Sequence, residues 1–427
     1  MSEKIKNITS KEFEEEVLKS GNVVVDFYST ECPPCEALAS KFESLSEVYG
    51  EDVKFIKIFR QENKELAVSL GVTGSPTLLF FKNGEMVGQR LSGGIKRADI
   101  VKNLELLISK ERAETLKNSL KKSETNCDVL ILGGGPAGLT SGIYSAQAKL
   151  NTIIVDKDLP GGQVKVTHMV WNYPGYEEPI SGYMLMHNMT EQAKATGVNF
   201  RSAVDITWID LVNKSVEIDG VETIRAKKII IATGSSPRKL GVKGELEYKG
   251  QGISYCATCD AKFYEGKHVV VIGGGNSAIE EALFITKFAS KVTIVHQFDK
   301  LQANKVAQEK AFANPKIEFI FEHEPREFVK NGSVVNEVLV EDLRTHEYKT
   351  INCDGVFIFA GMMPNLDDFD NRLTLDKWGY VNVDANMKTN IDDVFAIGDV
   401  AGKQFRQITT AVADGTVAAI TISKELE

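Results

Sequence analysis

The sequence lacks any run of about 18 apolar residues, which is the length that a membrane-spanning helix requires. It also lacks a basic stripe: the formal net charge is −9, which argues against nucleic acid as a partner. The opening residues are charged and contain no apolar signal region. We therefore predict a cytoplasmic protein without membrane or nucleic-acid partners, in a compartment where thiols are kept reduced.

Cysteine is scarce, at six residues in 427, yet four of the six form two Cys-x-x-Cys pairs, Cys32/Cys35 and Cys256/Cys259. In a reducing compartment this usage indicates redox chemistry or metal binding rather than structural disulfides. A four-cysteine zinc site fits poorly, because the pairs lie roughly 220 residues apart and no histidine pair with ligand spacing flanks them. We predict no metal site, and we expect Cys127 and Cys353 to be buried structural residues.

The length predicts several domains, of which residues 1–109 form the first. An apolar strand at 22–29 leads into Cys32 and an amphipathic helix, so the Cys32 sulfur can lie at a helix N-terminus, which stabilises a thiolate. Asp26 lies inside that strand, where an ionised carboxylate is costly to bury. It is therefore a candidate proton acceptor for Cys35, and the alternative is a hydrogen-bonded strand carboxylate without a catalytic role.

The rest of this segment carries two turn signals and a polar tail. Pro76 directly precedes an apolar strand, a position that favours a cis Ser75–Pro76 bond. Residues 77–93 predict a β-hairpin around Asn83 and Gly84. Residues 110–125 are polar and contain neither glycine nor proline, which predicts a helical, semi-rigid linker. The alternative is an extension of the preceding helix.

From residue 126 the pattern becomes strand, glycine turn, helix and strand. Gly133 permits the tight turn, Gly135 lets the backbone approach a pyrophosphate, and Gly138 allows the helix to pack closely on the strand. The helix N-terminus favours the anion, and Asp156 at the end of the next strand can accept hydrogen bonds from ribose hydroxyls. Together these features predict a dinucleotide site.

The same plan recurs over residues 267–298, so the chain contains an internal duplication of a nucleotide-binding unit. Gly273 and Gly275 repeat the turn, and Ala278 takes the packing position. The following strand ends at His296 without a carboxylate, and no arginine follows that could hold a 2′-phosphate. The pattern predicts a second nucleotide site, and the alternative is a nucleotide fold that no longer binds a ligand.

These motifs resemble two known families. Residues 1–109 resemble thioredoxin, in Asp26, the Cys32/Cys35 pair with Pro34, and the stretch around Pro76. Residues 126–427 resemble the low-molecular-weight bacterial type of thioredoxin reductase in the motifs GGGPAG (133–138), GGQV (161–164), NYPGY (172–176), ATGSSPR (232–238), CATCD (256–260), GGGNSAIEEA (273–282) and VFAIGDVAGKQFRQITTAVADG (394–415). The chain is thus similar to a natural fusion of thioredoxin with its reductase.

The resemblance implies an α/β fold, with a thioredoxin fold (1–109) and a linker (110–125) ahead of two Rossmann-like domains. The FAD-binding domain would comprise residues 126–239 and 367–427. The pyridine-nucleotide domain, residues 240–366, would be inserted in it and would carry the second cysteine pair. The family is homodimeric, and its inserted domain must rotate, because one face of the flavin cannot meet nucleotide and cysteines at once.

The resemblance also implies an electron path. Electrons from NADH or NADPH reach FAD and then Cys259; Cys256 attacks thioredoxin, and Asp260 serves as acid and base. The Cys32/Cys35 pair then reduces protein disulfides.

Two sets of residues are implied to bind the cofactors. The FAD set, in which Asp399 would meet the ribityl–phosphate region and Arg406 and Gln407 the flavin ring, is Gly133, Gly135, Pro136, Ala137, Gly138, Asp156, Gly162, Gln163, Asn172, Ala232, Thr233, Gly234, Gly398, Asp399, Arg406, Gln407 and Ile408. The pyridine-nucleotide set is Gly273, Gly275, Asn276, Ser277 and Ala278.

The chain departs from relatives that use NADPH at the end of the second unit's strand. Those relatives carry His-Arg-Arg and a further arginine, where this chain has His296, Gln297, Phe298 and Gln302. Removing a charge-assisted hydrogen bond costs ~1.5–3 kcal/mol, so we expect NADH to be favoured over NADPH. Reduced ferredoxin, which some flavin thioredoxin reductases use, is the alternative donor.

The thioredoxin segment departs too, with Glu31 where tryptophan is usual, Pro33 for glycine and Glu36 for lysine. One alternative function is reduction of a peroxiredoxin, as in alkyl hydroperoxide reductase, whose flavoprotein also has an N-terminal thioredoxin-like module. Another is a non-enzymatic, flavin-bound redox sensor. The presence of both cysteine pairs with Asp26 and Asp260 favours an enzyme, because a sensor needs none of them.

Overall fold

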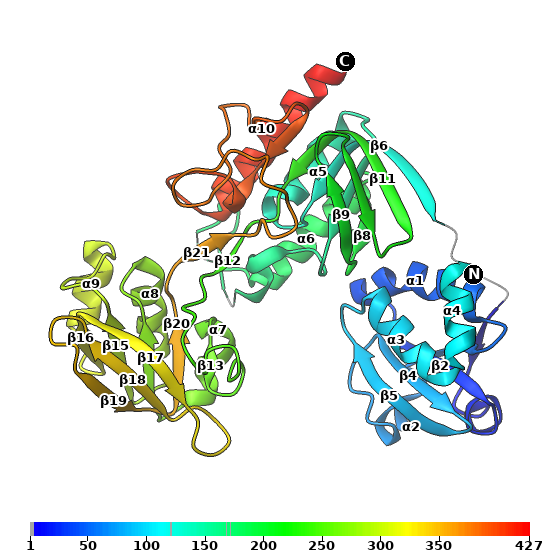
Figure 1. The fold of residues 1–427 in the computed structure, drawn as a ribbon, viewed down its shortest axis with the longest axis horizontal. Helices are drawn as coiled ribbons and strands as arrows, with labels where there is room; N and C mark the ends of the chain where they lie inside the picture. The colour runs from blue at the N-terminus through cyan, green and yellow to red at the C-terminus, as the bar shows by residue number, and fades with distance from the viewer. Residues whose placement is uncertain (1–3, 120–121, 168, 171) are drawn as a thin grey trace.

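The computed structural model describes residues 4–119, 122–167, 169–170 and 172–427. Figure 1 shows three lobes, which we call the N-terminal unit (residues 5–118), the central unit (123–231 and 394–426) and the inserted unit (253–358). Each lobe is built around its own β-sheet. The α/β fold class expected from the sequence is confirmed.

The N-terminal unit has a five-stranded sheet in the order β1-β3-β2-β4-β5. Because alternate strand residues point to opposite faces, Val24 and Phe55 pack under one set of helices, and Val23 and Ile56 pack under another. The elements are β1 Ile5–Ile8, a short π-helix Glu14–Leu18, β2 Asn22–Tyr28, α1 Pro33–Tyr49, β3 Lys54–Phe59, α2 Lys64–Ser69, β4 Thr77–Lys82, β5 Glu85–Ser92, α3 Arg97–Leu107 and α4 Lys110–Asn118.

Both turn predictions for this unit are confirmed. Strands β4 and β5 pair antiparallel, and Asn83 and Gly84 between them have φ angles of 52° and 83°. The Ser75–Pro76 bond is cis.

Helix α4 packs on the N-terminal unit, so the linker between the units is shorter than the expected residues 110–125. The segment is helical from residue 110 to 118, as expected, but Ala113 and Leu116 are only 5% and 6% exposed. Leu116 joins the core of the N-terminal unit, and Arg112 forms an ion pair with Asp52 at 2.9 Å. A polar helix buries even a short apolar stripe of this kind. Since β6 begins at residue 123, the connection between the units reduces to residues 119–122.

The central unit has a sheet in the order β8-β7-β6-β11-β10-β9, and β22 also pairs with β11. The register Ile229↔Val394 pairs β22, in the C-terminal part of the chain, with β11. Strand β11 in turn pairs with β6, which leads into the first glycine turn. The elements are β6 Ser123–Leu132, α5 Pro136–Gln147, β7 Thr152–Asp156, a 3₁₀ turn Gly162–Val166, α6 Gly182–Ala195, β8 Asn199–Ser202, β9 Ile206–Asp210, β10 Ser215–Ile218, β11 Glu222–Ile231, β22 Val394–Ala396, a 3₁₀ turn Gly398–Val400 and α10 Ile408–Leu426.

The inserted unit has a parallel sheet in the order β13-β20-β14-β15-β16 and a three-stranded sheet β17-β18-β19. Two antiparallel strands, β12 Ser235–Pro237 and β21 Met362–Pro364, connect it to the central unit. Its elements are β13 Ile253–Ser254, α7 Ala257–Asp260, a 3₁₀ turn Ala261–Tyr264, β14 His268–Ile272, α8 Asn276–Ile285, β15 Lys291–His296, α9 Lys305–Phe312, β16 Ile317–Phe321, β17 His323–Val329, β18 Glu337–Asp342, β19 Tyr348–Asn352 and β20 Gly355–Ile358.

Within the described ranges, no helix combines the length and the apolar character that crossing a bilayer requires. The same residues contain no cluster of three or more His, Cys, Asp or Glu side chains that could hold a metal ion.

Candidate active site

The first glycine turn lies between β6 and α5. Gly133 has a φ of 114°, and a Cβ there would lie 2.3 Å from the carbonyl oxygen of Ala232. A Cβ on Gly138 would lie 2.0 Å from the carbonyl oxygen of Gly133. At Gly135, by contrast, the nearest atom to such a Cβ is 3.9 Å away. Two of the three glycines are therefore required by packing, and the third keeps space open at the N-terminus of α5.

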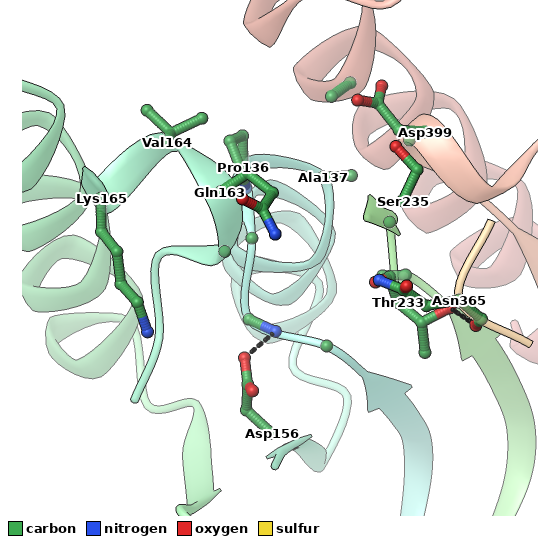
Figure 2. A pocket seen from close by; sticks show the side chains of 18 of the residues that line it. Pro136, Ala137, Asp156, Gln163, Val164, Lys165, Thr233, Ser235, Asn365 and Asp399 are labelled. Carbon is green, nitrogen blue, oxygen red and sulfur yellow. Dashed lines mark hydrogen bonds between the residues drawn. The ribbon is translucent and has the colours of Figure 1, made fainter. Parts of the chain in front are cut away.

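That space belongs to a cavity of about 1020 Å³ in the central unit, which is large enough for a dinucleotide. In Figure 2, Asp156 and Asp399 lie at opposite ends of the view, with Pro136 and Gln163 between them. The expected FAD-binding residues that line the cavity are Gly133, Gly135, Pro136, Ala137, Asp156, Gly162, Gln163, Asn172, Ala232, Thr233, Gly234, Gly398, Asp399, Arg406, Gln407 and Ile408.

Asp156 ends β7 and accepts two backbone hydrogen bonds. Its Oδ2 accepts from the Gly134 N–H at 2.7 Å, the dashed line in Figure 2, and its Oδ1 accepts from the Asp158 N–H at 2.9 Å. Burial raises the pKa of Asp156 to about 6, although both bonds favour the ionised form. The carboxylate thus holds the glycine turn in place and still has lone pairs for a ligand hydroxyl.

At the other end of the cavity, two charged groups have atoms without a partner among the described residues. Asp399 Oδ1 and Arg406 Nε are buried and make no hydrogen bond there. Burial raises the pKa of Asp399, against the opposing charges of Lys403 and Arg406. A buried polar group without a partner is destabilising, so these atoms are suited to a polar ligand. FAD carries hydroxyl and phosphate groups for them and a pyrophosphate for the open turn at Gly135.

Side chains from distant segments meet around this end of the cavity. The Asn172 amide donates to Gln407 Oε1 at 2.9 Å, and the Arg406 guanidinium stacks over the Tyr380 ring at 3.7 Å. Asn365 also lines the cavity, although no local motif in the sequence marks it. Its amide donates to the Thr233 carbonyl at 2.9 Å, and the Thr233 hydroxyl donates to the Asn365 carbonyl at 2.8 Å. Asn365 is recognised as part of the site only through this pairing with Thr233, from which the inserted unit separates it in the sequence.

The second glycine turn, between β14 and α8, repeats the backbone of the first. Gly273 has a φ of 132°, and a Cβ there would lie 2.3 Å from the Phe359 carbonyl oxygen. Around Gly275 a Cβ would meet no atom within 4 Å, so this turn is open as well. Ala278 is fully buried, while Asn276 Oδ1 accepts from the Asn304 N–H at 2.7 Å and Ser277 is exposed.

β15 ends at a histidine, where a ribose-binding acid would stand. His296 is 4% exposed, and its ring would lie 2.5 Å from a Cβ on Gly274. Burial lowers the pKa of His296, so the ring is neutral at physiological pH. Gln297, Phe298 and Gln302 are exposed beside it. The surface at this strand end therefore offers amides and an aromatic ring rather than guanidinium groups.

The first cysteine pair forms a disulfide, Cys32–Cys35, at the start of α1. Cys32 is the N-cap residue, and its sulfur accepts from the Cys35 N–H at 3.2 Å. Pro33 lacks an N–H, and Glu31 before the pair has a φ of 50°.

Asp26, in the neighbouring strand, is 2% exposed and lies 3.5 Å from Lys57 Nζ. Burial raises the pKa of Asp26 to about 6, and Lys57 lowers it less than burial raises it. A carboxyl with a pKa near neutrality can exchange a proton at physiological pH.

The second pair lies on the inserted unit, around α7. Cys256 is disulfide-bonded, and the side chain of Cys259 lies outside the described residues. The Cys256 sulfur lies 3.9 Å from the carbonyl oxygen of Val166, a residue that lines the central cavity. The structure thus places Cys256 beside the cavity. Asp260 ends α7.

Glu245 supports the segment that carries this pair. It is 1% exposed, and its carboxylate accepts from the N–H groups of Leu240 and Gly241 at 2.9 and 2.7 Å. It also accepts from the Tyr255 hydroxyl at 2.6 Å. Glu245 therefore ties the segment that follows β12 to the residue that precedes Cys256.

The two cysteine pairs are separated in this arrangement. In Figure 1, α1 lies beside the central unit near β8, while α7 lies in the opposite lobe. The structure therefore places Cys256 beside the cavity, whereas the Cys32–Cys35 disulfide lies at the start of α1 in the N-terminal unit.

Comparisons with known proteins identify both parts of the chain. The family model described as pyridine nucleotide-disulphide oxidoreductase matches residues 127–415, and the thioredoxin model matches residues 4–106. The thioredoxin reductase of Peptoclostridium acidaminophilum is 44% identical over 307 residues, which cover 70% of this chain and 97% of that protein. That of Bacillus subtilis (strain 168) is 41% identical over 300 residues, covering 70% and 95%. The crystal structure of Lactococcus lactis thioredoxin reductase in its FR conformation superposes with a TM-score of 0.65 at 39% identity, covering 70% and 98%.

Proposed function

This chain belongs to the pyridine nucleotide-disulphide oxidoreductase family, as a thioredoxin reductase with a thioredoxin domain at its N-terminus, and we propose that it carries electrons to its own thioredoxin. The proposed path runs from a reduced pyridine nucleotide through FAD and Cys256/Cys259 to Cys32/Cys35, and on to protein disulfides. The observation that carries this proposal is the placement of one cysteine pair against the cavity and of the other on the fused domain.

We propose that FAD occupies the cavity of the central unit. The open turn at Gly135 and the N-terminus of α5 would hold the pyrophosphate. Asp156 would hold ribose hydroxyls, and Asp399 and Arg406 would use the atoms that lack partners among the described residues. When bound, FAD supplies a two-electron carrier between nucleotide and thiols.

The thiol chemistry would then proceed by two exchanges. The Cys256 thiolate attacks the Cys32–Cys35 disulfide, so that a mixed disulfide forms and the leaving sulfur takes up a proton. Cys259 attacks the mixed disulfide, which restores the Cys256–Cys259 bond and releases thioredoxin as a dithiol. Asp260 would handle protons at the reductase pair, and Asp26 would do so at Cys35.

We propose NADH as the favoured donor. The exposed strand end at Gln297 and Phe298 supports this, because a 2′-phosphate would find no guanidinium there. The open turn at Gly275 supports a pyridine nucleotide rather than reduced ferredoxin.

We propose a FAD-binding domain of residues 126–239 and 367–427, a pyridine-nucleotide domain of residues 240–366, a homodimer, and a cytoplasmic location. A peroxiredoxin is the alternative recipient of the electrons.

The donor is tested by anaerobic mixing of the enzyme with NADH, NADPH or reduced ferredoxin while the flavin absorbance is followed. We expect bleaching by low NADH. Bleaching at a comparable rate by NADPH would contradict the preference, and bleaching by ferredoxin alone would assign that donor.

The path is tested by turnover with a protein disulfide. We expect Cys32→Ser to abolish it, while Cys127→Ala, a change at a buried free cysteine, leaves it intact. Turnover that persisted in Cys32→Ser would show that the fused domain is dispensable. Addition of peroxiredoxin and peroxide, with NADH consumption as the readout, tests the alternative recipient.

A further inference from the structure

Lys41 of α1 is a buried lysine, and two of its three hydrogen-bond acceptors lie in another unit. It is 7% exposed, and its ammonium donates to the carbonyl oxygens of Ser202 and Ala203 in the central unit at 2.8 and 2.7 Å. A third bond, at 3.0 Å, goes to the Ile95 carbonyl in its own unit. Burial lowers the pKa of Lys41 to about 8, although acidic groups of the central unit oppose this. A lysine is rarely buried unless its charge is compensated, and here that compensation comes from across the interface.

Two ion pairs flank Lys41 on either side. Lys96 Nζ lies 2.6 Å from Asp205 Oδ1, and Lys194 Nζ of α6 lies 2.7 Å from Glu36 Oε2. Glu36 is the residue that replaces the lysine usual in thioredoxins, so this replacement has a partner in the attached reductase. The two surfaces are therefore complementary in charge, with one pair in each direction.

The backbone at Gly94 also lies close to side chains of the central unit. A Cβ on Gly94 would lie 3.3 Å from Asp158 Oδ1 and 3.7 Å from the Ala203 Cβ. Ala203, whose carbonyl accepts from Lys41, has a φ of 54°, in the left-handed region that is strained for an alanine. Such strain persists only where the surroundings hold it, and Lys41 is one of the groups that hold it here.

The contact uses the redox end of α1. Pro33 and Glu36, which adjoin the disulfide, line a cavity of about 660 Å³ between α1 and the central unit, together with Thr190 and Lys194. Cys32 itself is 8% exposed. In Figure 1, α1 lies in the N-terminal unit next to the central unit, and α7 lies in a different lobe.

We propose that the central unit carries a docking site for the chain's own thioredoxin, held by Lys41, Lys96–Asp205 and Glu36–Lys194, and that this docked state stores the thioredoxin away from Cys256. Reduction of the Cys32–Cys35 disulfide then requires release from the docking site. The rate of turnover is set in part by the fraction of molecules that are undocked. The predicted effect on the turnover rate rests on the proposed electron path. The docking of the thioredoxin on the central unit does not depend on that path.

The first test measures shape by small-angle X-ray scattering on the full-length, FAD-loaded protein. We expect Lys41→Met to increase the radius of gyration relative to wild type, while Lys64→Met, an exposed lysine on α2 of the same unit, leaves it unchanged. The wild type should also expand as salt is raised, because exposed ion pairs are screened. Identical scattering from Lys41→Met and wild type would overturn the docking.

Exchanging the two charges of one ion pair distinguishes loss of docking from general damage to the fold. Lys96→Glu and Asp205→Lys should each expand the molecule, and the double variant should return it towards the wild-type dimensions. Expansion in both single variants without recovery in the double variant would remove this ion pair from the docking site.

The second test measures steady-state reduction of a protein disulfide with the donor that bleaches the flavin. We expect Lys41→Met to turn over about twofold faster or more, because release is no longer needed. Expansion with a lowered rate would overturn the storage role and make docking part of the productive path. If the wild type shows no turnover with any donor, the proposed electron path fails, while the scattering still decides the docking.

Discussion

The Lys57 ammonium lies 3.5 Å from the Asp26 carboxylate in the middle of the N-terminal sheet. Even so, burial raises the pKa of Asp26 by more than the positive charge of Lys57 lowers it. The pKa of Asp26 rises from 3.8 to about 6. Between these two pH values the folded protein binds more protons than the unfolded chain, so ionisation of Asp26 destabilises the fold as pH rises through this window. A group kept at such a cost in the strand next to Cys35 is suited to proton exchange.

Asp26→Asn removes this cost. We expect no change in stability near pH 4 and a gain that grows to at most about 3 kcal/mol above pH 6, since each pKa unit corresponds to about 1.36 kcal/mol. Scanning calorimetry of the full chain should show one transition moving upward at pH 7 but not at pH 4. Glu62→Gln, an exposed acid of the same unit, is the control. An equal shift at both pH values would mean that Asp26 acts through packing and not through its charge.

Two glycines of the first turn should separate folding from cofactor binding. Gly135→Ala adds a methyl group where the nearest atom is 3.9 Å away, so the apo-protein should keep its melting temperature but lose FAD. Gly138→Ala places the methyl 2.0 Å from a carbonyl oxygen, so the fold itself should suffer. The FAD content after gel filtration and the melting temperature of the apo-protein distinguish the two effects. Full FAD retention in Gly135→Ala would place the pyrophosphate elsewhere.

Arginines placed at the end of β15 should recruit NADPH. We expect Gln297→Arg with Phe298→Arg to raise kcat/KM for NADPH by about tenfold or more, because each charge-assisted hydrogen bond contributes about 1.5–3 kcal/mol. The value for NADH should change little. Steady-state kinetics with both nucleotides measures the ratio, and Gln61→Arg, at an exposed position of the N-terminal unit, controls for added charge. An equal gain for both nucleotides would indicate general attraction of anions.

Glu245 should control the rigidity of the approach to Cys256. Glu245→Ala leaves the N–H groups of Leu240 and Gly241 and the Tyr255 hydroxyl without their acceptor, which should cost about 2–4 kcal/mol locally. Hydrogen exchange followed by mass spectrometry should show faster exchange in peptides spanning 238–256. Tyr255→Phe should have a smaller effect, and the exposed neighbour Glu247→Ala should have none. Unchanged exchange in Glu245→Ala would remove this role.

Local sequence patterns were enough to predict the secondary structure around the two glycine turns and around the first cysteine pair. Each depends on a strand, a turn and a helix that are adjacent in the sequence, so periodicity and turn chemistry carry the information. The interpretation of α4 was less complete, because two apolar residues in a polar segment do not reveal which surface covers them. The burial of Ala113 and Leu116 on the preceding core depends on tertiary packing.

The contacts across the units could not be predicted at all. Lys41 and its acceptors are more than 160 residues apart, and the acceptors are backbone carbonyls, which no side-chain pattern marks. Glu36 was visible only as a departure from its family, and its partner Lys194 carries no motif. The same holds for Asn365, whose role emerges only from its pairing with Thr233 across the inserted unit.

The packing of α4 has a mechanical consequence. With α4 fixed to the thioredoxin core and β6 fixed in the central sheet, residues 119–122 are what joins them, and four residues extend to about 14 Å. A connection of this length limits how far α4 and β6 can separate from each other. The cysteine pairs that the thioredoxin can reach, in its own subunit or in a second copy, are therefore limited by the length of this tether.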